Sequence, residues 1–182
     1  MHFRNLSVAA LVSFITLAFT RPTAPTTDEI DNLPDGIYSI TKYNNGTFSD
    51  IISLGTTESL AGSSVDIVAP AKTQALPNPE TNCVSRSLNA NDLRGARNGL
   101  NDWCERGNYL NPRTSVWVKN KSAQAYMCYY GTGTGPCHTW ETDDAHALMD
   151  AACGSLNAAW VYINDWQKSY GRDTSGIAEC GW

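Results

Sequence analysis

The chain has 182 residues, which is enough for one domain with a substantial hydrophobic core. It carries 13 Lys and Arg against 18 Asp and Glu, and this net charge of −5 argues against a nucleic-acid binder that relies on overall charge. Six Trp, eight Tyr and four Phe argue against a chain that is disordered throughout.

The first twenty residues are typical of a secretory signal peptide. Arg4 precedes a mostly apolar run at residues 6–19, and the small residues Ala18 and Thr20 suit a cleavage point. The run has about 14 residues, fewer than the ~20 that cross a bilayer as a helix. We therefore predict that residues 1–20 are a signal peptide and that the mature protein is secreted and extracellular, without a transmembrane segment. A membrane anchor is the alternative.

Two segments precede the cysteines. Residues 21–36 are rich in Pro and Thr and are predicted to be an extended leader or a short propeptide. Residues 37–81 are predicted to hold a β-hairpin followed by a linker. The hairpin turn is expected at residues 44–46, because Asn-Gly supplies positive φ angles between two apolar groups. The linker carries one weak strand signal at Val65–Val68.

Residues 82–182 are predicted to form a cysteine-framed α+β domain. One helix is expected to begin at a cap on Asn91, because apolar residues recur after it with helical spacing. Another is expected to begin at a cap on Thr142, with acidic residues in its first turn. The expected elements are a strand near Cys83, a helix from Asn91 to about Arg106, strands at Thr114–Lys119 and Ala123–Tyr130, a helix from Thr142 to Gly154, and a final strand at Ala159–Ile163.

This order predicts an α+β fold in which two helices pack on one face of an antiparallel sheet. It is the arrangement of a split βαβ sandwich, with the N-terminal β-hairpin added. The even number of cysteines in a secreted chain predicts three disulfides, with 15 possible pairings. Because no C-x-x-C spacing occurs, a structural zinc site is the weaker alternative. The cysteines are Cys83, Cys104, Cys128, Cys137, Cys153 and Cys180.

The sequence does not define a catalytic centre. His138 is interpreted as a surface histidine beside a disulfide, and His146 lies one position off the apolar stripe of its helix. Gly131–Gly135 lacks the ending of a phosphate-binding loop and is interpreted as a strand-to-helix connection. We therefore predict no catalytic residues, no metal and no cofactor. A secreted nuclease would be assembled from His138, Glu141, Lys168 and Arg172.

Aromatic residues gather on or near the predicted strands, and core packing accounts for most of them. Residues 164–173 mix Trp, Tyr, Lys and Arg after the last predicted strand, which is a reasonable composition for a contact patch; a solvated loop is the alternative. Two N-glycosylation sequons, at Asn45 and Asn120, fall in predicted turns. The candidate interaction patch is Trp140, Trp166, Lys168, Tyr170 and Arg172.

The signal peptide, the Pro/Thr leader, the strand start at residues 35–38 and the six late cysteines together resemble small secreted proteins of filamentous fungi. The helix–strand–strand–helix–strand order at residues 91–163 looks like the α/β sandwich of the fungal killer-toxin and necrosis-inducing effector families. The resemblance covers about 100 residues and rests on element order. It implies a protein without a catalytic centre, which acts by binding host proteins, membranes or wall polymers.

We therefore predict a secreted fungal effector or virulence protein that binds a host protein as a monomer. Later entry into host cells stays open. A polysaccharide-binding module that takes a wall polysaccharide is the first alternative. A small secreted hydrolase or ribonuclease and an antimicrobial killer-type toxin are the others.

Overall fold

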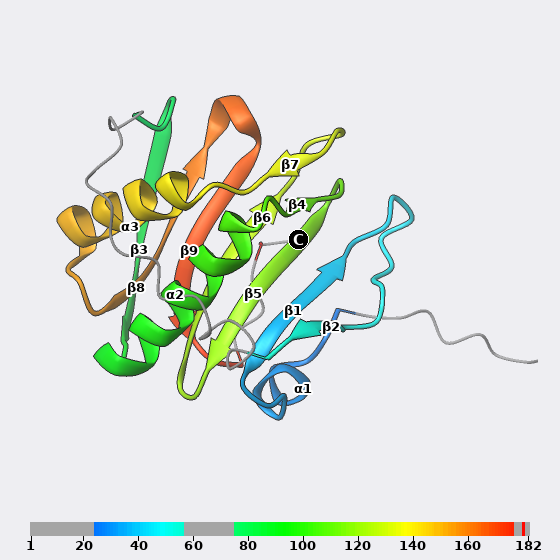
Figure 1. Ribbon diagram of the computed structural model, residues 1–182, viewed down its shortest axis with the longest axis horizontal. Helices are drawn as coiled ribbons and strands as arrows, with labels where there is room; N and C mark the ends of the chain where they lie inside the picture. The colour runs from blue at the N-terminus through cyan, green and yellow to red at the C-terminus, as the bar shows by residue number, and fades with distance from the viewer. Residues whose placement is uncertain (1–23, 57–74, 177–179, 181–182) are drawn as a thin grey trace, which may run out of the picture.

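A seven-stranded antiparallel sheet forms the centre of the protein (Figure 1). The structure is a computed structural model that describes residues 24–56, 75–176 and 180. The strand order is β2-β1-β5-β6-β9-β8-β3, and the short strands β4 and β7 pair separately. The strands are β1 Gly36–Thr41, β2 Ile52–Gly55, β3 Pro79–Ser87, β4 Tyr109–Leu110, β5 Thr114–Asn120, β6 Ala123–Tyr129, β7 Gly135–Pro136, β8 Asn157–Ile163 and β9 Lys168–Thr174.

Two long helices cover one face of this sheet (Figure 1). They are α2, Ala90–Glu105, and α3, Thr139–Cys153. The short helix α1, Thr27–Asp31, packs on the opposite face, where Ile30 joins the cluster around Trp117. A 3-10 turn, η2 at Asn164–Trp166, connects β8 to β9. The predicted α+β class, with two helices on one face of an antiparallel sheet, is confirmed.

A hydrophobic core lies on each face of the sheet, because successive side chains of a strand point to opposite faces. Val116 and Val118 of β5 face α2 and α3, whereas Trp117 between them faces α1. The same alternation in β6 places Met127 toward the helices and Tyr126 away from them. Burial on both faces explains why β5 and β6 are buried along almost their whole length.

Both helices begin earlier than the sequence predicts. The side chain of Asn89, not Asn91, caps α2 by accepting hydrogen bonds from the amides of Asn91 and Asp92 at 3.0 and 3.1 Å. Thr142 lies inside α3, and its hydroxyl donates to the carbonyl of Thr139 one turn earlier. The predicted stop of α3 at Gly154 agrees with the structure.

The predicted hairpin belongs to the main sheet. β1 pairs with β2 on one side and with β5 on the other, so residues 37–55 share one sheet with the cysteine-framed region. The amide of Tyr43 donates to the carbonyl of Thr47 across the turn, and Gly46 has a φ of +82°. The predicted signal peptide and the strand signal at residues 65–68 lie outside the described residues.

The prediction that Ala159–Ile163 is the final strand is wrong. The chain returns through η2 into β9, which lies between β6 and β8 and is almost wholly buried. Lys168 and Arg172 gave this segment the character of an exposed loop. Both cations are buried instead, because each has an acidic partner on α3.

Three disulfides form, as predicted, and two of them join an outer element to the sheet. Cys83–Cys153 joins β3 to the end of α3, Cys104–Cys137 joins the end of α2 to the segment before α3, and Cys128–Cys180 joins β6 to the C-terminal region. The bridged residues are 70, 33 and 52 positions apart. Loops of this length correspond to about 4 kcal/mol each in the chain-entropy account of disulfides.

A close contact in the sheet gives a first prediction. Tyr126 lies opposite Gly171, and a Cβ at position 171 would be 2.2 Å from the Cζ atom of that ring. Gly171→Ala should therefore lower the free energy of unfolding by about 1–3 kcal/mol, measured by urea titration. Gly133→Ala is the matched control, because its Cβ would meet only one atom, at 3.8 Å. Equal stabilities of the two variants would contradict this packing.

Candidate functional site

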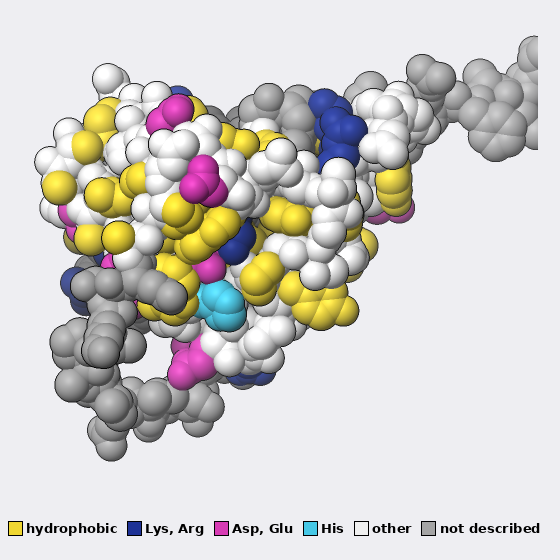
Figure 2. Space-filling model, turned by 90° about the horizontal axis from the view of Figure 1, so that it is seen from above, with side chains coloured by type: hydrophobic (Ala, Val, Ile, Leu, Met, Phe, Trp, Pro, Cys, Tyr) yellow, Lys and Arg dark blue, Asp and Glu magenta, His cyan; other side chains and the backbone are white. Residues whose placement is uncertain are grey.

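A pocket of about 600 Å³ opens at the end of the sheet where α3 begins. Figure 2 looks onto this end of the molecule and shows a hollow in which basic and acidic side chains lie among hydrophobic ones, with a histidine at its edge. The end of β6, the loop to β7, the first turn of α3, η2 and the start of β9 all contribute to it. The lining residues are Tyr129, Thr134, Gly135, Pro136, His138, Trp140, Glu141, Trp166 and Lys168.

Two tryptophans form a corner in this pocket. The rings of Trp140 and Trp166 lie nearly perpendicular, with centroids 5.9 Å apart and an interplanar angle of 85°. The imidazole of His138 stacks on Trp140 at 6.3 Å with an angle of 12°. Trp140 and Trp166 are half-buried and His138 is exposed, so these rings present apolar surface to the pocket.

The glycine-rich loop wraps around another aromatic wall. A Cβ at Gly131 would lie 2.3 Å from the hydroxyl of Tyr129, and one at Gly135 would lie 2.6 Å from its ring. The glycines therefore allow the backbone to pass close to Tyr129. This supports the interpretation of residues 131–135 as a strand-to-helix connection.

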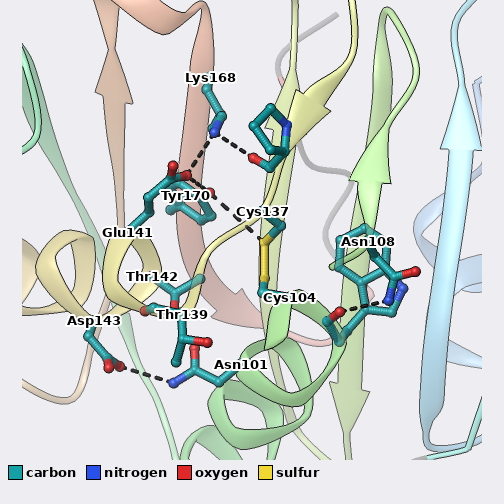
Figure 3. The surroundings of a disulfide bond; sticks show 12 residues. Asn101, Cys104, Asn108, Cys137, Thr139, Glu141, Thr142, Asp143, Lys168 and Tyr170 are labelled. Atoms are coloured by element: carbon teal, nitrogen blue, oxygen red, sulfur yellow. Dashed lines mark hydrogen bonds and ion pairs between the residues drawn. A yellow bond between two sulfur atoms is a disulfide. The ribbon is translucent and has the colours of Figure 1, made fainter. Parts of the chain in front are cut away.

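A buried ion pair forms the floor of the pocket. Lys168 Nζ lies 2.7 Å from Glu141 Oε2, and the two side chains are only 3% and 4% exposed. Lys168 also donates to the carbonyl of Pro136 at 2.6 Å, and the hydroxyl of Tyr170 donates to the same oxygen of Glu141 (Figure 3). These contacts fix β9, β7 and the first turn of α3 to one another.

The environment of this floor shifts two pKa values. Burial lowers the pKa of Lys168, while the hydrogen bond and charge of Glu141 act in the opposite direction. Burial raises the pKa of Tyr170 well above its usual value, and the charge and hydrogen bond of Glu141 raise it further. Tyr170 is therefore a protonated donor at neutral pH. The ammonium of Lys168 also lies 5.2 Å from the ring centroid of Trp166, close enough for a cation–π contact.

A disulfide holds the start of α3 beside this floor (Figure 3). Cys137 is bonded to Cys104 of α2, and its amide donates to the carbonyl of Asn108 at 3.2 Å. Asn101 of α2 donates to Asp143 of α3 at 3.0 Å. The segment that carries His138 and Trp140 is thus fixed to α2 by covalent and polar contacts.

The candidate patch does not form one surface. Trp140 and Trp166 line the pocket and Lys168 lies at its floor, but Tyr170 and Arg172 are in the interior, 1% and 0% exposed. Arg172 pairs with Asp150 and donates to the carbonyls of Gly154 and Asn157 at 2.8 Å each. Of the set considered for a nuclease, His138, Glu141 and Lys168 meet at the pocket and Arg172 does not.

The second histidine lies away from the pocket. His146 is eight residues after His138, about 12 Å along a helix, and is 2% exposed. Burial and the charges of Arg97 and Arg172 lower its pKa well below the usual value. Its Nδ1 atom has no hydrogen-bond partner among the described residues. His146 is therefore a neutral interior side chain.

The two sequons differ in their surroundings. Asn45 is exposed at the hairpin turn, where its side-chain oxygen accepts a hydrogen bond from the amide of Thr47. The side-chain nitrogen of Asn120 donates to the carbonyl of Asp92 at 2.9 Å and lies against Gly95 of α2. A glycan on Asn120 would displace that contact, so the geometry favours Asn45 as the acceptor.

The sequence did not identify Tyr129, Thr134 or Pro136 as pocket residues. A signal for Tyr129 was present, because glycines that recur next to an aromatic residue favour a backbone that passes close to a ring. Pro136 contributes a carbonyl to Lys168, and a backbone group of this kind has no signature in the sequence.

Within the described ranges 24–56, 75–176 and 180, no three His, Cys, Asp or Glu side chains gather as metal ligands. None of the helices in those ranges is long and apolar enough to span a membrane. No protein-family model, curated protein or solved structure matches the chain. The resemblance to killer-toxin and necrosis-inducing effectors therefore stays a prediction from element order.

The ion pair gives a second prediction. Lys168→Met leaves the buried carboxylate of Glu141 without its cation and should cost about 3–5 kcal/mol of unfolding free energy. Adding Glu141→Gln removes the unpaired charge, so the double variant should be more stable than Lys168→Met alone. Chemical denaturation of the wild type, of each single variant (Lys168→Met and Glu141→Gln) and of the double variant measures the coupling. Additive losses would show that the two charges do not interact.

The third prediction concerns acid stability. Because folding lowers the pKa of His146, this imidazole takes up a proton below about pH 6.5 in the unfolded chain but stays neutral in the folded chain. Above that pH the imidazole is neutral in both the folded and the unfolded chain, so it does not affect the free energy of unfolding. Below that pH the free energy of unfolding falls as the pH falls, by up to about 1.4 kcal/mol per pH unit. His146→Gln should reduce this slope between pH 6.5 and 5, measured by urea unfolding.

The matched control for acid stability is His138→Gln, which removes an exposed imidazole at the start of α3, the helix that also carries His146. Its pH dependence should follow the wild type. A His146→Gln variant with the wild-type slope would show that the interior imidazole accepts a proton without penalty.

Proposed function

We propose that the chain is a secreted effector protein that acts by binding a host protein at the end of the molecule formed by the aromatic pocket. The observation that supports this proposal is the corner formed by the perpendicular rings of Trp140 and Trp166, which lies above the buried ion pair of Lys168 and Glu141. Tryptophan is enriched among the residues that dominate binding energy at interfaces, because its large ring is rigid and amphipathic. A partner side chain or group that enters the corner would bury both rings.

The state of Glu141 favours binding over catalysis. One oxygen of its carboxylate already accepts hydrogen bonds from Lys168 and Tyr170, and those contacts hold the fold together. A general base has to take a proton from a substrate, and a carboxylate that holds the first turn of α3 to β9 is poorly suited to that change. The floor therefore serves to hold the pocket in shape.

Secretion is part of the proposal. The apolar run at residues 6–19 supports export, and three disulfides support an oxidising destination. The bridge Cys104–Cys137 has a direct bearing on binding, because it fastens the segment that carries His138 and Trp140. The oxidised form is thus the binding form.

A second candidate is a small secreted hydrolase. It is favoured by one observation, that His138, Glu141 and Lys168 line the same pocket. His138 is exposed and available to a substrate. In that case His138→Gln would abolish turnover of RNA or glycan by the pure protein, whereas our proposal expects no turnover to abolish.

The fourth prediction tests the binding proposal. The oxidised protein is immobilised and exposed to extracellular fluid of host tissue, and each captured protein is purified and titrated against it. A specific partner should bind Trp166→Ala about 30-fold or more weakly, which corresponds to the loss of ~2 kcal/mol at an interface hot spot. Thermal unfolding of Trp166→Ala confirms that the variant is folded.

Tyr43→Ala is the matched control, because Tyr43 is an exposed aromatic residue, 50% accessible, at the hairpin turn. It should bind the partner like the wild type. A partner that binds all three proteins equally, or hydrolysis that depends on His138, would contradict the proposal.

A further inference from the structure

We infer that the pocket binds a neutral sugar ring at the end of a glycan chain. This inference rests on the proposed binding function and names what the site recognises on its partner. It is carried by the shape of the aromatic walls, by the unused hydrogen-bonding groups of the floor, and by the balance of charge between them.

The walls fit a ring with apolar faces. A pyranose presents C–H groups on its faces and hydroxyls on its edge, so it packs flat against an aromatic side chain. Trp140 and Trp166 meet at 85°, which closes the pocket on one side of any ring stacked on either of them. A flat row of coplanar rings would suit the middle of a polymer, whereas a corner suits its end. The volume of about 600 Å³ lies in the ~300–1,000 Å³ range of small-molecule sites.

The floor offers a donor and an acceptor side by side. An ammonium has three N–H groups, and Lys168 uses two of them, on Glu141 Oε2 and on the carbonyl of Pro136. Among the described residues, Glu141 Oε1 accepts no hydrogen bond, while Oε2 accepts two. Both side chains line the pocket. A pair of neighbouring hydroxyls, each a donor and an acceptor, satisfies both groups at once.

The charges argue for a neutral occupant. The Lys168–Glu141 pair has no net charge, so an anionic group that approaches the ammonium also approaches the carboxylate. A cation meets the reverse conflict. A wholly apolar ligand would bury the third N–H of Lys168 and Oε1 of Glu141 without hydrogen-bond partners, which is unfavourable for each group. A neutral polyol with apolar faces avoids all three penalties.

The rim adds a further polar group. His138 stacks on Trp140, is exposed and lines the pocket, so its imidazole lies at the rim. It is placed to contact the second sugar of a chain whose terminal ring occupies the corner. Recognition of a chain end is thus compatible with a glycan on a glycoprotein and with an oligosaccharide of a cell wall.

The test is a glycan array probed with the oxidised protein, followed by titration of the intrinsic tryptophan fluorescence. One arm carries neutral N-glycans, and a second carries neutral wall oligosaccharides of glucose, mannose, xylose and N-acetylglucosamine. Sulfated and uronic-acid glycans form the comparison arm. We expect binding in one of the neutral arms, which identifies the source, and at least about 10-fold weaker binding in the acidic arm.

Two variants assign the binding to the pocket. Trp166→Ala should weaken it at least about 30-fold, and Glu141→Gln, which replaces an acceptor by a mixed donor and acceptor, should weaken it about 10-fold while its unfolding transition is checked. Tyr43→Ala should bind like the wild type. The inference is overturned if no neutral glycan binds the wild type at millimolar concentration, or if a glycan binds Trp166→Ala as tightly as the wild type.

The same variants separate this inference from the proposed function. A purified partner whose binding depends on Trp166 is treated with glycosidases before titration. Loss of binding supports recognition of its sugar. Unchanged binding rejects the sugar and leaves the protein-binding function in place.

Discussion

The ion pair between Lys168 and Glu141 fixes the position of α3 on the sheet, and the pocket depends on that position. Lys168 begins β9, a strand in the middle of the sheet, and Glu141 lies in the first turn of α3. A charge removed from water at either place needs the other, since a buried ion without a partner costs several kcal/mol. The pair therefore brings Trp140, which precedes Glu141, next to Trp166, which comes just before β9.

A second ion pair sets the direction of the helix. Arg172 of β9 pairs with Asp150 near the end of α3. Glu141 and Asp150 are nine residues apart, about 13.5 Å along a helix, and Lys168 and Arg172 are four residues apart, about 13 Å along a strand. Because the two spacings are similar, both pairs form at once, and each holds a different turn of α3 to β9. The disulfide Cys83–Cys153 then ties the end of the helix to the edge strand β3.

The sequence predicted what depends on local pattern and missed what depends on distant partners. The apolar spacing of α2 and the Asn-Gly turn located a helix and a hairpin, and the even cysteine count predicted three disulfides without their pairing. β9 was missed because lysine and arginine side chains are usually exposed to solvent. Lys168 and Arg172 are buried in this strand because they pair with acidic residues that lie 27 and 22 positions earlier in the chain. Trp140 and Trp166 were selected as contact residues, but the corner that they form arises only when η2 and α3 come together.

The most direct test of this account is the accessibility of the lysines in the native, oxidised protein. Reductive methylation followed by peptide mapping reports each amine separately. Lys121 is exposed at a turn and should be methylated at once, whereas Lys168 should stay unmodified until the protein unfolds. Lys119, which is buried and donates to the carbonyl of Leu33 at 2.6 Å, should also be protected. Methylation of Lys168 as fast as that of Lys121 would show that no buried ion pair holds α3 and the pocket floor, and would contradict the account.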